Sequence, residues 1–159
     1  MRWLASGKSD DTFGVGGRVV LGTGTDAFAC AADEVGVVGL ANSDGQLLLV
    51  GLDATGGLQT TFGRAGIEPL ADPSGAPADS ARMVLDTGAI LAVVTVGTAS
   101  FVVRYRRDGQ LDTTFGHGGS CALGPLSLAT VASIAMAPDG KLLVLSTVAA
   151  QTLLARIWL

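Results

Sequence analysis

Apolar residues occur along the chain in short runs of about four to eight, and glycine, aspartate, proline or serine bounds each run. Runs of this length with such boundaries are typical of β-strands. The last third of the chain contains four of them, at 120–123, 132–137, 141–147 and 152–158. The third run is apolar almost throughout, whereas a strand with one solvated face alternates between apolar and polar residues. We therefore expect strands that are covered on both faces, as in stacked sheets.

The same succession of four runs occurs twice earlier in the chain. The middle third contains runs at 67–70, 80–85, 89–96 and 101–106, and the first third contains runs at 18–21, 27–32, 35–41 and 46–52. The pattern predicts an all-β protein with about twelve short antiparallel strands in three four-stranded sheets.

Two sets of landmarks place these runs in one register. The motif Thr-Phe-Gly occurs at Phe13, Phe62 and Phe115, and turn-forming aspartates recur at a spacing of 53 residues, at Asp33, Asp86 and Asp139. An aspartate precedes the next phenylalanine by 29 residues both at Asp33 and at Asp86. The chain is therefore interpreted as a single repeat domain, 1–159, with copies at about 13–61, 62–114 and 115–159, and with 1–12 completing the cut repeat. The length difference between copies falls in a loop around 69–78.

Four strands per copy, with an aromatic landmark and turn glycines at fixed offsets, are typical of a β-propeller blade. Two runs also resemble a known family: Ala135-Met-Ala-Pro-Asp-Gly-Lys-Leu-Leu-Val, and Val103-Arg-Tyr-Arg-Arg-Asp-Gly-Gln-Leu-Asp-Thr-Thr-Phe-Gly116. They look like the delta-60 repeat of bacterial proteins, which is similar to NHL-type propeller repeats. The first copy departs from that pattern, with Asp33-Glu34 where the family prefers Asp-Gly and Gln59 where it prefers Asp. The resemblance implies a β-propeller-like fold, often in exported or surface proteins, and it implies no common activity and no catalytic residues.

The composition agrees with strands and excludes several classes of partner. Hydrophobic residues make up 48% of the chain, the mean hydropathy is +0.50, and 23 glycines interrupt the apolar runs, which disfavours long helices. The net charge is −4 and no basic stripe is present, so we expect no nucleic-acid partner. The uncharged stretches are too short or too interrupted to span a membrane, and the first residues lack the apolar core of a signal peptide. The compartment stays open.

The residues that could carry chemistry are few. Cys30 and Cys121 are flanked by small or apolar residues and are expected to be buried, although a disulfide between them stays possible. A single histidine offers no zinc-ligand spacing, and the recurring aspartates suit turns better than a calcium site, so we expect no metal and no cofactor. The glycines after Thr-Phe open strands rather than helices, which argues against a phosphate-binding loop.

The weak candidates for ligand binding are Val15, Arg64 and His117, which occupy the same position after Thr-Phe-Gly, together with Glu68. A position that varies on a repeated scaffold is where binding specificity tends to occur. In a propeller this loop is expected to lead into the innermost strand, which would place the three residues at the rim of the channel. Arg104, Arg106 and Arg107 are interpreted as a solvated, charged strand edge.

The sequence predicts a non-catalytic binding or scaffold module that recognises a protein or a glycan on one face. One alternative is a propeller lyase or hydrolase with Glu68 or His117 at the channel mouth. Another is a purely structural self-assembling unit, either a natural fragment or a design.

The ends of the chain predict an assembly. Met1-Arg2-Trp3 aligns with residues 103–105, and residues 155–159 occupy the same place in the repeat. Three blades cannot close a ring, because propellers have about four to eight blades. We therefore expect a head-to-tail homodimer with six blades, in which the C-terminal segment fills the outer-strand position that it shares with 1–4.

Overall fold

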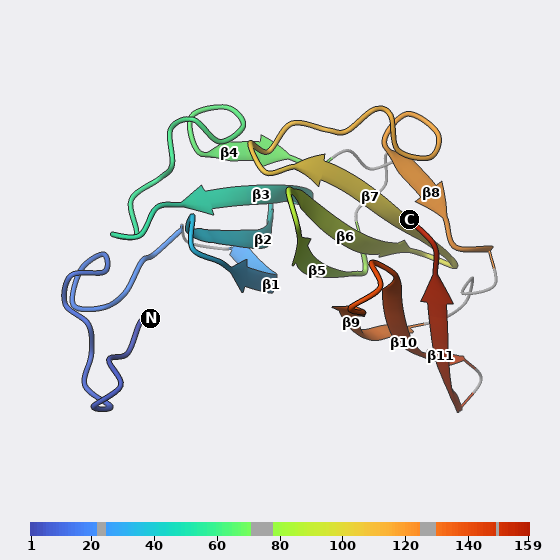
Figure 1. The fold of residues 1–159 in the computed structure, drawn as a ribbon, viewed down its shortest axis with the longest axis horizontal. Helices are drawn as coiled ribbons and strands as arrows, with labels where there is room; N and C mark the ends of the chain where they lie inside the picture. The colour runs from blue at the N-terminus through green and yellow to red at the C-terminus, as the bar shows by residue number, and fades with distance from the viewer. Residues whose placement is uncertain (22–24, 71–77, 125–129, 149) are drawn as a thin grey trace.

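The chain forms an all-β structure of three antiparallel sheets that follow one another along an arc (Figure 1). It is seen in a computed structural model that describes residues 1–21, 25–70, 78–124, 130–148 and 150–159. The first sheet has the strand order β1-β2-β3-β4, with bounds β1 Thr25–Ala32, β2 Val37–Ser43, β3 Gln46–Leu52 and β4 Ile67–Pro69. The second sheet has the order β5-β6-β7-β8, with bounds β5 Ser80–Asp86, β6 Ala89–Val96, β7 Ala99–Arg106 and β8 Ser120–Ala122.

The third sheet has three described strands in the order β11-β10-β9, with bounds β9 Thr130–Met136, β10 Leu142–Val148 and β11 Gln151–Ile157. The expectation of an all-β protein with three antiparallel sheets is confirmed. The expectation of four strands in every sheet is not met, since the described residues form eleven strands. The loop expected around 69–78 lies mostly outside the described residues, at 71–77.

The sheets begin at a different point in the repeat from the one expected. The short runs at 67–70 and 120–123 were expected to open a sheet, but their strands β4 and β8 each pair with the last long strand of the sheet before them. The reason lies in the Thr-Phe-Gly turns, which fold the chain back on that strand. The amide of Gly51 donates to the carbonyl of Gly66 at 2.9 Å, and the amide of Arg104 donates to that of Gly119 at 3.0 Å. β4 and β8 are therefore outer edge strands.

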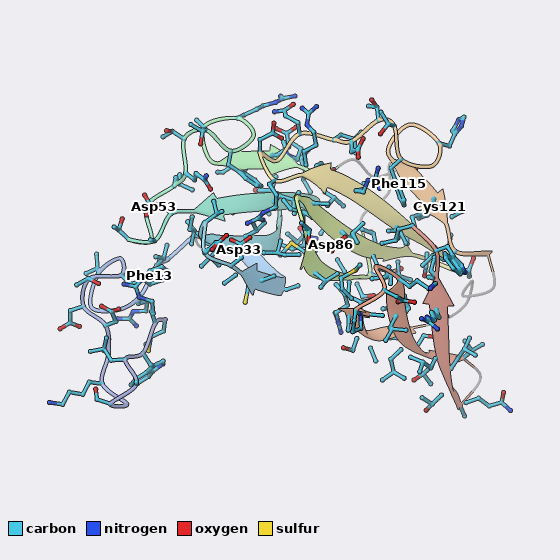
Figure 2. All side chains as sticks on the ribbon, viewed as in Figure 1. Phe13, Asp33, Asp53, Asp86, Phe115 and Cys121 are labelled. Carbon is cyan, nitrogen blue, oxygen red and sulfur yellow. The ribbon has the colours of Figure 1, made fainter. Side chains whose placement is uncertain are left out.

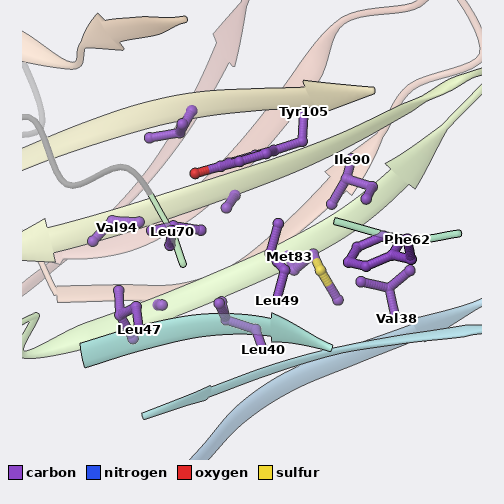
Figure 3. Packing of buried hydrophobic residues seen from close by; sticks show 13 residues of the cluster. Val38, Leu40, Leu47, Leu49, Phe62, Leu70, Met83, Ile90, Val94 and Tyr105 are labelled. Atoms are coloured by element: carbon purple, nitrogen blue, oxygen red, sulfur yellow. The ribbon is translucent and has the colours of Figure 1, made fainter. Parts of the chain in front are cut away.

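The three sheets meet along their first strands, because β5 packs against both β1 and β9. Apolar side chains fill the two gaps between sheets. The larger cluster, between the first and second sheets, contains Leu40, Leu49, Phe62, Ile90 and Tyr105 among its buried members (Figure 3).

The strand β6 contributes to both gaps. Ile90, Ala92 and Val94 belong to the cluster between the first two sheets, and Leu91 and Val93 belong to the cluster between the second and third. This alternation confirms for β6 the expectation of a strand covered on both faces, and it explains why the strand is apolar at consecutive positions.

The landmark aspartates are less equivalent than their spacing suggests. Asp86 pairs with Ala89 across a two-residue turn, and the amide of Asp33 donates to the carbonyl of Gly36 across a turn of the same length. Asp139 instead lies inside a longer turn that the hydrogen bond from Ala137 to Lys141 closes. The third hairpin thus holds one more residue, and β10 and β11 correspond to β6 and β7 at a spacing of 52 residues.

Candidate functional site

The three candidate positions after Thr-Phe-Gly occupy the same local turn. The main-chain amides of Val15, Arg64 and His117 donate to the carbonyls three residues ahead at 2.8, 2.7 and 2.7 Å. Val15 is 85% exposed, and Arg64 and His117 are also exposed. The side chains therefore point to solvent from equivalent turns.

These turns do not lie where the sequence placed them. Each precedes an outer segment, namely β4, β8 or residues 18–21, whereas the sheets meet at β1, β5 and β9. The expectation of a channel-rim position is wrong for Arg64 and His117, because the following strand is the outermost of its sheet rather than the innermost. Among the described residues, no hydrogen bond or ion pair joins the three candidates to one another.

Glu68 lies on β4, opposite Leu49 of β3. Its side chain is mostly buried, and its Oε2 atom is 3.9 Å from the Nε atom of Arg64 on the preceding turn. That oxygen has no hydrogen-bond partner in the described structure. We call each Thr-Phe-Gly turn, with the end of the strand before it and the short segment after it, an outer corner. Glu68 and Arg64 thus lie together at the outer corner of the first sheet, while His117 lies at the outer corner of the second sheet.

The strongest polar arrangement was missed in the sequence, and it occurs twice. The Nε atom of Arg2 donates to Oδ2 of Asp10 at 2.7 Å, and that of Arg104 donates to Oδ2 of Asp112 at the same distance. The signal was present as an arginine eight residues before an aspartate in both places.

Each of these carboxylates also binds a threonine hydroxyl. Asp10 accepts from Thr12 and Asp112 accepts from Thr114, both at 2.6 Å. The threonine hydrogen bond is the first cause that lowers the pKa of each aspartate, and the arginine adds to it. Both carboxylates therefore stay ionised at pH values where an ordinary aspartate begins to take up a proton.

Each arginine also covers a landmark phenylalanine. The guanidinium carbon of Arg2 lies 5.0 Å from the ring centre of Phe13, and that of Arg104 lies 4.6 Å from the ring centre of Phe115. These distances allow a cation–π interaction. We call the aspartate, threonine and phenylalanine the arginine socket: Asp10, Thr12 and Phe13 in the first corner, and Asp112, Thr114 and Phe115 in the third. Figure 2 labels the two phenylalanines.

The middle corner has no arginine socket. Gly51 stands at the position of the arginine and Gln59 at that of the aspartate. The ring of Phe62 packs directly on Gly51, where an added Cβ would lie 2.5 Å from the ring. A side chain at residue 51 would have to displace the buried ring, so close packing replaces the ion pair there.

The interpretation of the arginines as a solvated edge is corrected in part. Arg104 lies in the arginine socket of the third corner. Arg107 pairs with Asp33, which follows β1, at 2.5 Å, and this ion pair links the second sheet to the first. Only Arg106, paired with Asp108 at 3.5 Å, is an exposed edge residue of the expected kind.

The cysteines also differ from expectation. Cys30 and Cys121 are both exposed and both free, so neither is a buried hydrophobe. Among the described residues, no group of histidine, cysteine or acidic side chains is arranged to hold a metal ion. The part of the chain that the structure describes also contains no helix long and apolar enough to cross a membrane.

The two ends of the arc expose apolar surface. At one end, residues 19–21 and the outward face of the first sheet line a cavity of about 300 Å³, where Val20 and Leu21 are exposed while Val50 and Leu52 are buried. At the other end, Leu145 and Leu154 lie opposite each other on the outward face of the third sheet, and both are exposed. Trp158 follows β11 and carries the Lys141 ammonium over its ring.

Comparison with known families gives a match to part of the chain. A family model described as a domain of unknown function (DUF5122) beta-propeller matches residues 90–115, which cover β6 from its second residue, the strand β7 and the turn up to Phe115. Comparison with curated proteins and with solved structures gives no match. The match supports a β-propeller-related family.

Proposed function

We propose that this chain is a non-catalytic β-propeller module, a scaffold whose ring closes from two copies with six blades and which presents a binding surface for a protein or a glycan. The carrying observation is that both ends of the arc end in apolar faces with exposed side chains, Val20 and Leu21 at one end and Leu145 and Leu154 at the other. Soluble monomers rarely leave such faces uncovered.

The two end faces suit each other as the two sides of one gap between sheets. In the interior gaps, apolar residues of one sheet pack against apolar residues of the next. At one end the exposed Val20 and Leu21 border the apolar cavity, and at the other end Leu145 and Leu154 are exposed. Three blades fall short of the about four to eight that close a propeller, and two copies supply six. A head-to-tail pair closes around a two-fold axis.

The exposed turns at Val15, Arg64 and His117 support the binding part of the proposal. They repeat one backbone geometry with three different side chains. In a six-blade ring they would recur around the outer rim and offer a multivalent surface. The outer position of Glu68 gives no support to the alternative of an enzyme at the channel mouth.

Light scattering over a range of protein concentrations tests the assembly. We expect a dimer that dissociates on dilution. Leu154→Asp places a charge on the outward face of the third sheet and should leave a folded monomer. Thr98→Asp, at the exposed tip of the middle sheet, is the control and should leave the dimer unchanged. A wild-type monomer at all concentrations would overturn the proposal, and a trimer or larger ring would overturn the six-blade closure.

A further inference from the structure

Residues 1–21 have the same local fold as the outer corners of the first and second sheets, but they form no strand of the three sheets. In the complete sheets, an amide of the last long strand donates to the glycine carbonyl before the outer strand, as from Arg104 to Gly119 at 3.0 Å. The amide of Arg2 donates to the carbonyl of Gly17 at 2.8 Å in the same way. The arginine socket is also present here. Yet among the described residues, no strand pairs with 19–21.

This corner is seated on the first sheet as the next corner is seated on the second. The amide of Gly14 donates to the carbonyl of Thr55 at 2.7 Å, and the amide of Gly63 donates to that of Asp108 at 2.8 Å. Phe13 packs on Val50 and Leu52 of β3, as Phe62 packs in the gap between the first two sheets. The first corner therefore already holds the position of an outer corner that belongs to a preceding sheet.

The third sheet lacks what this corner offers. In the first and second sheets the last long strand pairs with a short outer strand, β4 or β8. In the third sheet, β11 forms the edge of the described strands. An unpaired edge presents a row of free amides and carbonyls that can accept another strand.

We infer that residues 18–21 of one copy form the fourth strand of the third sheet of a second copy. The inference rests on the proposed homodimer and specifies its contact. The partner is a second copy of this chain, because the segment 18–21 stands where β4 and β8 stand in the sheets that are complete. The binding mode is strand addition to a sheet edge.

The register follows from the complete sheets. Ile90 of β6 pairs with Tyr105, and Leu142 of β10 pairs with Ile157, so β11 corresponds to β7 at a spacing of 52 residues. Phe101 pairs with Ala122 in the second sheet. The corresponding pair across the two copies joins Leu153 to Val20.

The same correspondence assigns a role to Arg156. Arg156 stands at the position of Arg104 in β7. Arg104 fills the arginine socket of the third corner, and its counterpart in the first corner is Arg2. In the structure Arg2 fills the first socket, and Arg156 pairs with Asp139. In the assembly, Arg156 of the second copy replaces Arg2 beside Asp10 and on Phe13. Met1–Leu4 then moves away from residues 17–21, and β11 of the second copy takes its place.

A disulfide test reads the register directly. Cysteines at Val20 and Leu153, in a background with Cys30→Ser and Cys121→Ser, would face each other at a pair without main-chain hydrogen bonds. Side chains approach most closely at such pairs. We expect oxidation to yield a covalent dimer on a non-reducing gel. The control pair joins Val20 to Leu154, which points to the other face of β11, and it should cross-link far less.

The possible outcomes distinguish the shared strand from the homodimer. A dimer by light scattering that does not cross-link, or that cross-links equally through Leu154, would overturn the shared strand and leave the homodimer standing. A disulfide within one chain would also overturn the shared strand. A monomer before oxidation would overturn both proposals. A ladder of covalent oligomers would support the strand pairing and overturn closure with two copies.

Substitution of the two arginines should have opposite effects on the dissociation constant of the dimer, measured by analytical ultracentrifugation. Arg156→Ala removes a charge-assisted hydrogen bond and should raise the constant roughly ten- to a hundredfold. Arg2→Ala removes the internal competitor and should lower the constant or leave it unchanged. Asp139→Asn, which breaks the Arg156 contact of the free chain, is the control and should not weaken the dimer. A weaker dimer with Arg2→Ala and an unchanged one with Arg156→Ala would overturn the exchange.

Discussion

The second and third sheets share a strand pattern and differ in what surrounds them. Val93 and Val102 pair across β6 and β7 and are 1% and 0% exposed. Their counterparts Leu145 and Leu154 pair across β10 and β11 and are 38% and 64% exposed. The side chains are equally apolar, so burial here depends on whether another sheet follows. An end blade therefore carries the apolar surface of an inner blade and needs a neighbouring sheet to cover it.

A charge placed at the paired position of each sheet should give the largest contrast. Val93→Asp buries an unpaired carboxylate between two sheets and should lower the free energy of unfolding by more than about 4 kcal/mol. Leu145→Asp leaves its carboxylate in water and should cost less than about 1 kcal/mol in the monomer. Urea unfolding followed by circular dichroism, at a concentration where the chain is monomeric, measures both. Equal losses would show that the third sheet is covered within one chain.

The landmark phenylalanines extend the comparison to the other end of the arc. Phe62 is 1% exposed within the large cluster, and Phe62→Ala should cost about 3 to 5 kcal/mol because it opens a cavity between two sheets. Phe13 packs on one sheet only, in a cluster with two other buried residues. Phe13→Ala should cost about 1 to 2 kcal/mol, since the ring packs on one sheet only and the small cluster around it can collapse. The same unfolding assay applies, and an equal cost would mean that the first corner is as fully packed as the second.

The arginine sockets should make the corners differ in their response to acid. The pKa of Asp112 is lowered in the folded state, so its carboxylate stabilises the fold above the ordinary value of 3.8. That stability is lost as the pH falls below 3.8 through the folded-state pKa. Asp112→Asn should therefore lower the melting temperature at pH 7 and make it fall less between pH 7 and pH 2.

The middle corner supplies the control for this pH experiment. Gln59 stands at the equivalent position and carries no charge, so Gln59→Asn should leave the pH dependence of the melting temperature unchanged. An unaltered acid response in Asp112→Asn would show that the socket carboxylate does not couple protonation to folding.

The smallest effect concerns the two exposed thiols. Cys30 lies with Met1 and Phe13 around a hollow at the open end of the first sheet, whereas Cys121 lies on the outer strand β8. In a closed ring, the thiol of Cys30 should react several-fold more slowly with a thiol reagent at high protein concentration than at low. Cys121 in a Cys30→Ser variant serves as the comparison and should react at one rate throughout. Protection of both thiols, or of neither, would contradict the placement of the interface at the first sheet.

Local chemistry in the sequence was sufficient for the all-β class and for the equivalence of the corner turns. Runs as short as 142–145, bounded by turn residues, cannot form stable helices, and the repeated Thr-Phe-Gly motif predicted one turn geometry at Val15, Arg64 and His117. These features depend on residues that are neighbours in the chain. A spacing of eight residues between arginine and aspartate was also visible and went unused.

The tertiary structure alone decided which sheet each short run joins and which side chains are covered. The run at 120–122 pairs backwards with β7 because the turn at Phe115 folds the chain onto that strand, and this moves Arg64 and His117 from the expected channel rim to the outer edge. Cys30 and Cys121 are exposed although their neighbours in the sequence are small and apolar. Burial depends on packing between sheets far apart in the sequence, and Leu154 carries no local mark that sets it apart from its counterpart Val102.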